Sequence, residues 1–417
     1  MGILRGILVL IVLNVSPAFA YNSIEFPVKF GGWAEQSSVF FVRPNRESQE
    51  SNDAKIHTGF RLTSSYTNGH SSNISEMSDR IASSYQNLSA VAGYYLPSKS
   101  HRYASFVVGK FRNDYSVGGR YKKNNTFIRA NAGFRLGYRS RLKVAALSSS
   151  MTQRINSDNI KFGERPDQAE LNSVRVDYSI GREKARGFLN ITGEVIEYDF
   201  SNNDDSGSSD RLNALKRTST SVTSYLRYRK SSRSKLEALF SFTDFSYKES
   251  KDSSYQLYKF LVGAAGKPYD NLELSAITGL AFRDYNTYDK LIWSSRASAF
   301  WRYSPKVVTA LNLSDYFDDG GTSGRSSSVK GVNLMLSVSR TPKIWFGGAL
   351  AYSKVKSDTT NTIQSAAEIA ASYRYSKNFS LSVKYKYLNN YAGRVSDVFD
   401  DSVISVSAGL VSDFGGL

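Results

Sequence analysis

The chain has 417 residues, with 54 Lys and Arg against 37 Asp and Glu, so its net charge at pH 7 is +17. It contains no cysteine, which excludes a disulfide framework and leaves a packed core or a closed barrel to supply stability. By length alone the chain could form two or three soluble domains or one large barrel. The 27 Tyr and 24 Phe residues are what the aromatic girdles of a membrane barrel require.

The start of the chain has the three parts of a secretory signal peptide. Arg5 gives a basic start, residues 6–15 form an apolar run, and the small-x-small sequence that ends at Ala20 is a cleavage site. We therefore predict a signal peptide over residues 1–20, cleaved near Ala20. No later stretch approaches the roughly 18 apolar residues that a transmembrane helix needs, so such a chain would not be stopped in the inner membrane.

Residues 21–54 show no sustained repeat. Short apolar pieces are interrupted by Gly31-Gly32 and by a polar run over residues 43–53. We interpret residues 21–54 as a periplasmic N-terminal segment at the barrel mouth, and we expect the barrel itself to occupy residues 55–417.

Residues 127–139 show the pattern that the rest of the chain repeats. Alternate residues divide into an apolar set and a polar set, and only a β-strand places alternate residues on opposite faces. The apolar face is thin in the middle and ends in an aromatic ring, whereas the other face carries arginine and glycine, which is typical of a transmembrane barrel strand between lipid and a wet lumen. The apolar set is Ile128, Ala130, Ala132, Phe134, Leu136 and Tyr138, and the polar set is Arg129, Asn131, Gly133, Arg135, Gly137 and Arg139.

Strand patterns of this kind recur to the end of the chain. They predict an all-β fold, a transmembrane antiparallel up-and-down β-barrel of about eighteen strands, within a range of sixteen to twenty. The predicted strands are 56–63, 86–95, 102–112, 126–139, 142–151, 171–181, 187–199, 218–229, 234–247, 255–265, 270–283, 291–303, 306–317, 328–340, 343–354, 362–375, 378–388 and 402–414. Residues 362–372 are rich in Ala and could form a helix by propensity, but their alternation favours a strand.

The connections between these strands alternate between two kinds. One kind is short and basic, as at residues 140–141, 304–306 and 341–343, and the other is longer and rich in Asp, Ser and Asn, as at residues 152–170 and 200–217. Short turns face the periplasm and long loops face outward in bacterial barrels, so both ends of the predicted barrel fall on the periplasmic side.

Residues that could carry catalysis or bind a metal are sparse. Of the three histidines, only His57 lies in a predicted strand, where we interpret it as a lumen histidine, whereas His70 falls in a loop and His101 beside a turn. We predict no catalytic residue, no cofactor and no metal site. The acidic loop clusters, such as Asp204-Asp205, could hold Ca²⁺, but they are better interpreted as solvated tips or as contacts to lipopolysaccharide through divalent ions.

The predicted inward faces carry a row of basic and aromatic residues. Guanidinium groups recognise carboxylate and phosphate through paired hydrogen bonds, and aromatic rings stack on sugar faces, so this row suits an anionic polysaccharide. The alternative is that these charges only solvate a pore and balance acidic groups across it. The candidate lumen residues are Arg129, Arg135, Arg139, Arg175, Arg227, Arg283, Arg296, Arg302, Arg374, Lys384, Tyr225 and Phe300, with Arg61, Tyr198, Lys259 and Lys386 on the same faces.

The C-terminal part of the chain, from about residue 373, resembles the outer-membrane β-barrel porin family found in exopolysaccharide biosynthesis and secretion loci. That family shows a late Tyr-rich strand, a loop of Asn, Ser and Asp, and a last strand closed by an aromatic residue. Three residues follow the aromatic residue of this chain, and Asp401-Ser402 stands where the family more often has Asn. The matching residues are Tyr385, Tyr387, Asn389, Asn390, Ser396, Asp400 and Phe414.

The resemblance implies passage of a polymer through the bacterial outer membrane together with a periplasmic polysaccharide-export partner. With the basic lumen, it predicts a non-enzymatic channel for export of an anionic exopolysaccharide. The alternatives are a general anion-preferring diffusion porin and a plugged structural or adhesive barrel. Outer-membrane lipid, lipopolysaccharide and the barrel-assembly machinery are further expected partners, and nucleic acid is not.

Overall fold

The computed structural model describes the strands and most of the turns of the chain. The described residues are 59–72, 82–98, 102–116, 123–152, 168–181, 185–201, 216–248, 254–285, 289–318, 327–341, 343–357, 361–376, 378–392 and 399–414. The predicted signal peptide, the predicted segment 21–54, His57 and His101 lie outside them. Among the described residues, no helix is long and apolar enough to cross a membrane.

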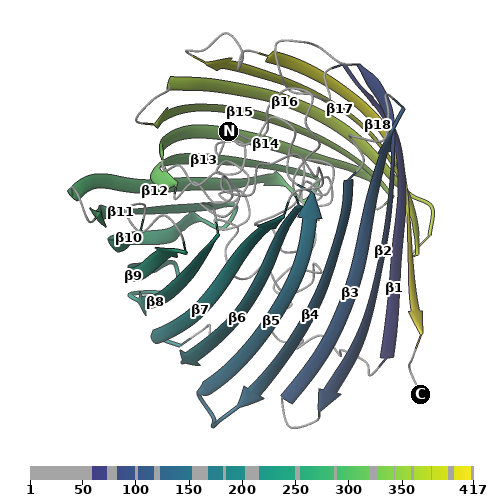
Figure 1. The fold of residues 1–417 in the computed structure, drawn as a ribbon. Helices are drawn as coiled ribbons and strands as arrows, with labels where there is room; N and C mark the ends of the chain where they lie inside the picture. The colour runs from purple at the N-terminus through teal and green to yellow at the C-terminus, as the bar shows by residue number, and fades with distance from the viewer. Residues whose placement is uncertain are drawn as a thin grey trace.

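Eighteen strands form one closed antiparallel sheet, which confirms the predicted fold class (Figure 1). Each strand pairs with its neighbours in sequence, and β1 pairs with β18 to close the barrel. The strands are β1 Gly59–Ser71, β2 Ser83–Ser98, β3 Arg102–Tyr115, β4 Lys123–Arg135, β5 Ser140–Thr152, β6 Gln168–Ile180, β7 Gly187–Ser201, β8 Arg217–Arg229, β9 Ser234–Tyr247, β10 Tyr255–Tyr269, β11 Leu272–Tyr285, β12 Asp289–Ser304, β13 Val307–Asp318, β14 Ser327–Thr341, β15 Ile344–Ser357, β16 Asn361–Arg374, β17 Phe379–Ala392 and β18 Phe399–Phe414.

The Ala-rich segment near residue 362 is strand β16, so alternation decided its structure over helix propensity. Its apolar residues Ala367 and Ile369 alternate with Glu368, which is 8% exposed and lies opposite Lys386 of β17. A helix would have placed these residues around its axis and left both neighbouring strands with an unpaired edge.

Register divides the whole sheet into an outward and an inward face. Residues that pair across neighbouring strands share a face, and one of the two faces carries nearly all the exposed large apolar side chains, such as Phe60, Leu226, Leu280 and Val406. That face is the outside of the barrel, because apolar side chains there meet lipid instead of water. The opposite face holds the buried aromatic clusters and most of the basic residues in the middle of the strands.

Exposed aromatic residues gather on the outward face near the end of the barrel that carries the short turns. Tyr94, Tyr228, Trp301 and Tyr375 belong to this group, and Trp301 packs edge-on against Tyr303 with ring centroids 5.7 Å apart. Rings with a polar edge suit the boundary between hydrocarbon and headgroups, so this group forms one aromatic girdle.

Several predicted ends differ from those observed. β1 continues to Ser71, so His70 lies on a strand and not in a loop. β4 ends at Arg135, because the chain turns back over residues 136–139 through the backbone hydrogen bond from Leu136 N to Ser140 O. β10 runs through the predicted turn at Gly266 to Tyr269, and a register shift between these two residues accommodates Pro268 in the strand.

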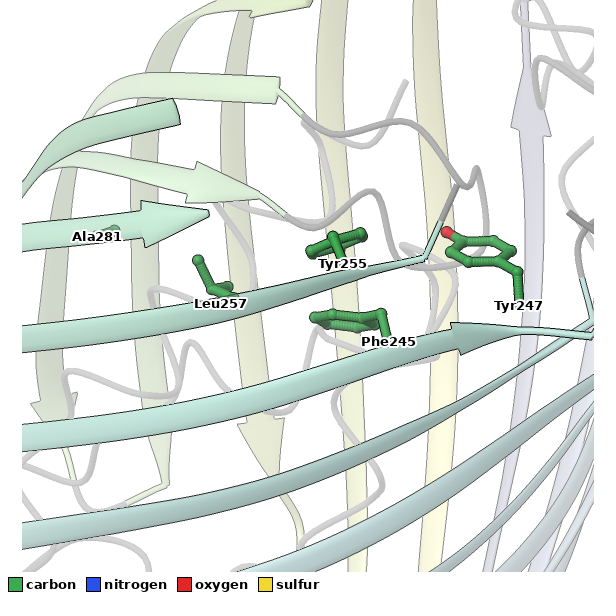
Figure 2. Close-up of a cluster of buried hydrophobic side chains, with 5 residues drawn as sticks. All are labelled: Phe245, Tyr247, Tyr255, Leu257 and Ala281. Carbon is green, nitrogen blue, oxygen red and sulfur yellow. The ribbon is translucent and has the colours of Figure 1, made fainter. Parts of the chain in front are cut away.

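Side chains from neighbouring strands form buried clusters on the inward face. Figure 2 shows one cluster from β9, β10 and β11, in which Phe245 and Tyr255 stack with ring centroids 4.5 Å apart beside Leu257 and Ala281. A second cluster joins Leu171 of β6 to Tyr198 of β7. The inner wall is therefore partly lined by packed rings instead of being wholly polar.

Three inward aromatic rings lie flat over glycines of the neighbouring strand. Tyr85 covers Gly69, Phe127 covers Gly109, and Tyr103 covers Gly133, and a Cβ at any of these glycines would come under 3.0 Å from the ring. Each ring and its glycine are paired in register. The missing side chain lets the ring lie along the wall instead of pointing into the bore.

We expect Gly133→Val to destabilise the barrel by about 1–3 kcal/mol, because the new side chain overlaps the Tyr103 ring and forces it off the wall. Urea unfolding of the protein refolded in detergent measures this change. Gly193→Val is a control for adding valine at a strand glycine, since Gly193 is on the outward face and a Cβ there meets nothing within 4 Å. Equal stability of the two variants would contradict the packing role of Gly133.

Candidate functional site

The inner wall is the candidate functional site, because the predicted lumen residues converge there. Register places the predicted residues on the inward face, with one exception. Arg139 was expected on strand 126–139, but it lies exposed in the turn after β4 and is not part of the wall. The residues on the wall are Arg129, Arg135, Arg175, Tyr225, Arg227, Arg283, Arg296, Phe300, Arg302, Arg374 and Lys384.

Charge is unevenly distributed around the wall. Strands β4 to β12 carry most of the inward basic residues, which outnumber the inward acidic residues Asp177, Glu194, Glu237 and Glu273. Strands β16 and β17 carry a second group with Arg374 and Lys384. The described inward residues of β13 to β15 include no cation, and the one acidic residue at an inward position is Asp318, at the end of β13. The wall therefore has two cationic sectors separated by neutral ones.

Arg217 of β8 shows how the wall holds its cations. Its guanidinium carbon lies 4.7 Å from the centre of the Tyr198 ring and 5.4 Å from that of Tyr247, which stand opposite it on β7 and β9. Nη1 of Arg217 also donates a hydrogen bond to the Tyr247 hydroxyl at 3.1 Å. The residue is only 1% exposed, so ring faces replace water around the charge.

The same pairing of cation and ring recurs along both cationic sectors. The guanidinium carbon of Arg283 lies 3.5 Å from the Tyr255 ring centre, and that of Arg227 lies 4.9 Å from the Phe188 ring centre. On β16, Arg374 lies over Trp345 at 5.2 Å. Aromatic faces thus orient several of the wall arginines and keep them close to the strands.

Other wall cations are held by polar neighbours. Arg175 forms a salt bridge with Asp177 at 2.9 Å, and its side chain is 47% exposed. Nε of Arg129 donates a hydrogen bond to Asn131 at 2.9 Å. Arg135 donates to the backbone carbonyls of Gly137 and Tyr138 in the short turn after β4. These half-exposed arginines are preorganised and can still offer further donors to a ligand in the bore.

The neutral sectors present hydroxyl and amide groups. Thr67 of β1 and Ser407 of β18 share a hydrogen bond of 2.8 Å across the seam that closes the barrel. On β13 and β14, Asn312 and Asn333 are paired in register on the inward face. The side-chain amide of Asn333 makes no hydrogen bond, and neither does the hydroxyl of Ser353 on β15. Asn333 and Ser353 are buried, at 4% and 0% exposed, so these two side chains are part of the packing of the wall.

Sequence reasoning did not include Arg217, Tyr247 or Tyr255 among the lumen residues. Arg217 begins β8, one residue before the predicted strand, but it has the same parity as Arg227 and could have been found by extending the alternation. Tyr247 and Tyr255 end and begin their strands, where strand and loop composition are hard to separate. Their contacts depend on register between strands, which no single strand pattern contains.

Among the described residues, no three His, Asp or Glu side chains gather in a way that could hold a metal ion. His70 lies on the outward side of β1, with Nδ1 3.4 Å from the Ser84 hydroxyl.

An even-stranded closed antiparallel barrel, apolar outside and polar inside, has the fold of outer-membrane β-barrel proteins. Solved structures of such proteins match it. OccK2 (OpdF) of Pseudomonas aeruginosa in complex with glucuronate matches with a TM-score of 0.51 and 13% identity over 85% of this chain and 98% of that chain. The FrpB iron transporter of Neisseria meningitidis, F5-1 variant, matches with a TM-score of 0.52 and 8% identity over 85% of this chain and 82% of that chain. No family model matches the sequence. No curated protein matches it.

We expect Arg217→Met to lower the free energy of unfolding by about 2 kcal/mol. The variant keeps an unbranched side chain but loses the guanidinium group, and with it the two ring contacts and the hydrogen bond to Tyr247. Tyr247→Phe keeps the ring and removes only the hydroxyl, so its loss should be smaller. Urea unfolding in detergent ranks the two variants. An Arg217→Met protein as stable as the wild type would mean that repulsion among the basic residues cancels the stacking.

Proposed function

We propose that this protein is an outer-membrane channel for an anionic saccharide and that its cargo is an acidic exopolysaccharide moving outward. The observation that carries the proposal is the inner wall itself, where arginines are held against aromatic rings on β7 to β12. Cations and rings are the two kinds of group that bind the carboxylates and the faces of acidic sugars.

The arrangement suits passage better than tight binding. The most buried arginines, Arg217 and Arg283, are 1% and 3% exposed, so they supply positive potential more than direct contacts. Half-exposed residues such as Arg175 can exchange hydrogen bonds with passing carboxylates. A cargo that meets many weak cationic contacts in turn can enter and also leave.

Two other functions use the same wall. A general diffusion porin with anion preference needs the cations but no export partner, and the likeness to OccK2, whose structure holds glucuronate, supports this candidate. A structural or adhesive barrel would need neither passage nor selectivity. The outward direction and a periplasmic partner are supported by the resemblance of the C-terminal strands to barrels of exopolysaccharide loci.

Reversal of the wall charge tests the role of the inner face. We expect Arg129→Glu combined with Arg175→Glu to lower the permeability ratio of chloride over potassium several-fold in planar bilayers, because both side chains lie on the cationic sector of the wall. Arg139→Glu makes one such substitution, with half the change of charge, in the turn beyond β4, so its ratio should stay near the wild-type value.

Equal selectivity of the wild type, the double variant and the control would contradict a conducting wall on this face. A wild-type protein that inserts and gives no steady current would favour the structural barrel.

Loss of the protein should trap acidic polysaccharide in the periplasm. The expected result in a deletion strain is polymer in the periplasmic fraction and little in the medium, restored by the wild-type protein and restored poorly by the Arg129→Glu, Arg175→Glu protein. Uronic acid content of the two fractions measures the distribution. Unchanged secretion with slower uptake of glucuronate would replace the export proposal with the diffusion porin.

A further inference from the structure

An apolar groove of about 340 Å³ opens on the outward face of strands β14 to β17. It forms because β16 presents small side chains there, Ser365 and Ala367, between larger neighbours on both sides. Leu350 and Tyr352 of β15 form one side of the groove, and Tyr387 of β17 forms the other. The groove therefore runs along β16 in the lipid-facing surface, and the small size of the β16 side chains leaves the space for it.

Three lysines lie on the outward face beyond the outer end of this groove. Along β15 the outward residues Leu350 and Tyr352 are followed by Lys354 and Lys356, so the lysines begin about 7 Å past the tyrosine at the usual strand rise. Lys330 of β14 stands directly opposite Lys354. This end of the strands carries the longer connections, which face the cell exterior in bacterial barrels.

The charges of these lysines are only partly compensated. Lys330 forms a salt bridge with Asp315 of β13 at 3.1 Å. Lys354 and Lys356 are exposed and form no ion pair among the described residues. Like charges directly opposite each other across two strands are destabilising, so Lys330 and Lys354 gain most from a shared anion.

A second outward groove, of about 680 Å³, lies near the periplasmic end and shows a contrasting arrangement. The two basic residues that line it are both paired, Arg233 with Asp270 at 3.1 Å and Lys267 with Glu273 of the inward face. Of these two grooves, the outer one alone has lysines near its end that form no ion pair among the described residues.

We propose that the outer groove and its lysines bind lipopolysaccharide of the outer leaflet, with an acyl chain along β16 and a phosphate of the lipid headgroup between Lys330, Lys354 and Lys356. A lipid with acyl chains and phosphate groups fits both features: the acyl chain fits the apolar groove, and the phosphate fits the lysines beyond its outer end. This inference is independent of the cargo that passes through the bore.

Native mass spectrometry of the purified full-length protein, titrated with lipopolysaccharide in detergent containing EDTA, tests the site. We expect one retained lipopolysaccharide, with affinity about fivefold weaker after Lys354→Gln and about thirtyfold weaker after Lys354→Gln with Lys356→Gln. Ala367→Phe fills the groove and should weaken binding with all three lysines in place. These are lipid-facing changes, and heat-modifiable migration on gels checks that each variant is folded.

Lys248→Gln is the matched control, because this lysine lies at the same end of the barrel but is neutralised by Glu197 at 2.7 Å. Its lipopolysaccharide binding should equal that of the wild type. Unchanged binding by the double lysine variant would overturn the proposal, and so would equal binding of phosphatidylglycerol, which would identify a general anionic-lipid surface. Loss of wild-type binding in EDTA would assign the contact to a bridging divalent ion and would also overturn it.

Discussion

The structure depends on the requirement that no backbone amide or carbonyl be left unpaired in hydrocarbon. Eighteen strands satisfy it by pairing each with the next, and the bonds between β1 and β18 remove the two edges that an open sheet would have. Hydrogen bonds therefore decide the shape, and the side chains decide only which face meets lipid. This explains how a chain with a mean hydropathy of −0.37 can still form a barrel of the membrane-spanning kind.

Once the backbone is closed, the outward face can only be apolar or interfacial, and nearly every charge in the middle of the strands is confined to the inward face. The inner wall therefore carries many cations that repel one another. Contacts with aromatic rings stabilise the charges of Arg217 and Arg283, and salt bridges with carboxylates stabilise those of Arg175 and Lys235. The packing of the wall and its positive charge thus come from the same side chains.

The strand number and most lipid faces could be predicted because each strand carries its own alternation. The wall assignments of Arg129, Arg227 and Arg374 follow from that parity alone. The ends of strands were less predictable, since Arg139 continues the pattern of β4 in sequence although the chain has already turned. The rings around Arg217 and the groove over β16 depend on neighbours that only the register between strands brings together.

Among the described residues, the inner faces of β13 to β15 carry no cation, and this shapes the electric field inside the barrel. Because the cations occupy two sectors and not a complete ring, the attractive potential for an anion is strongest in two bands close to the wall, one broad and one narrow, which follow the tilt of the strands. A narrow polyanion in the bore would follow one side and leave water beside it. Ionic current would then fall in part, and not to zero, while the polymer is inside, and the depth of that block would report how much of the cross-section the polymer occupies.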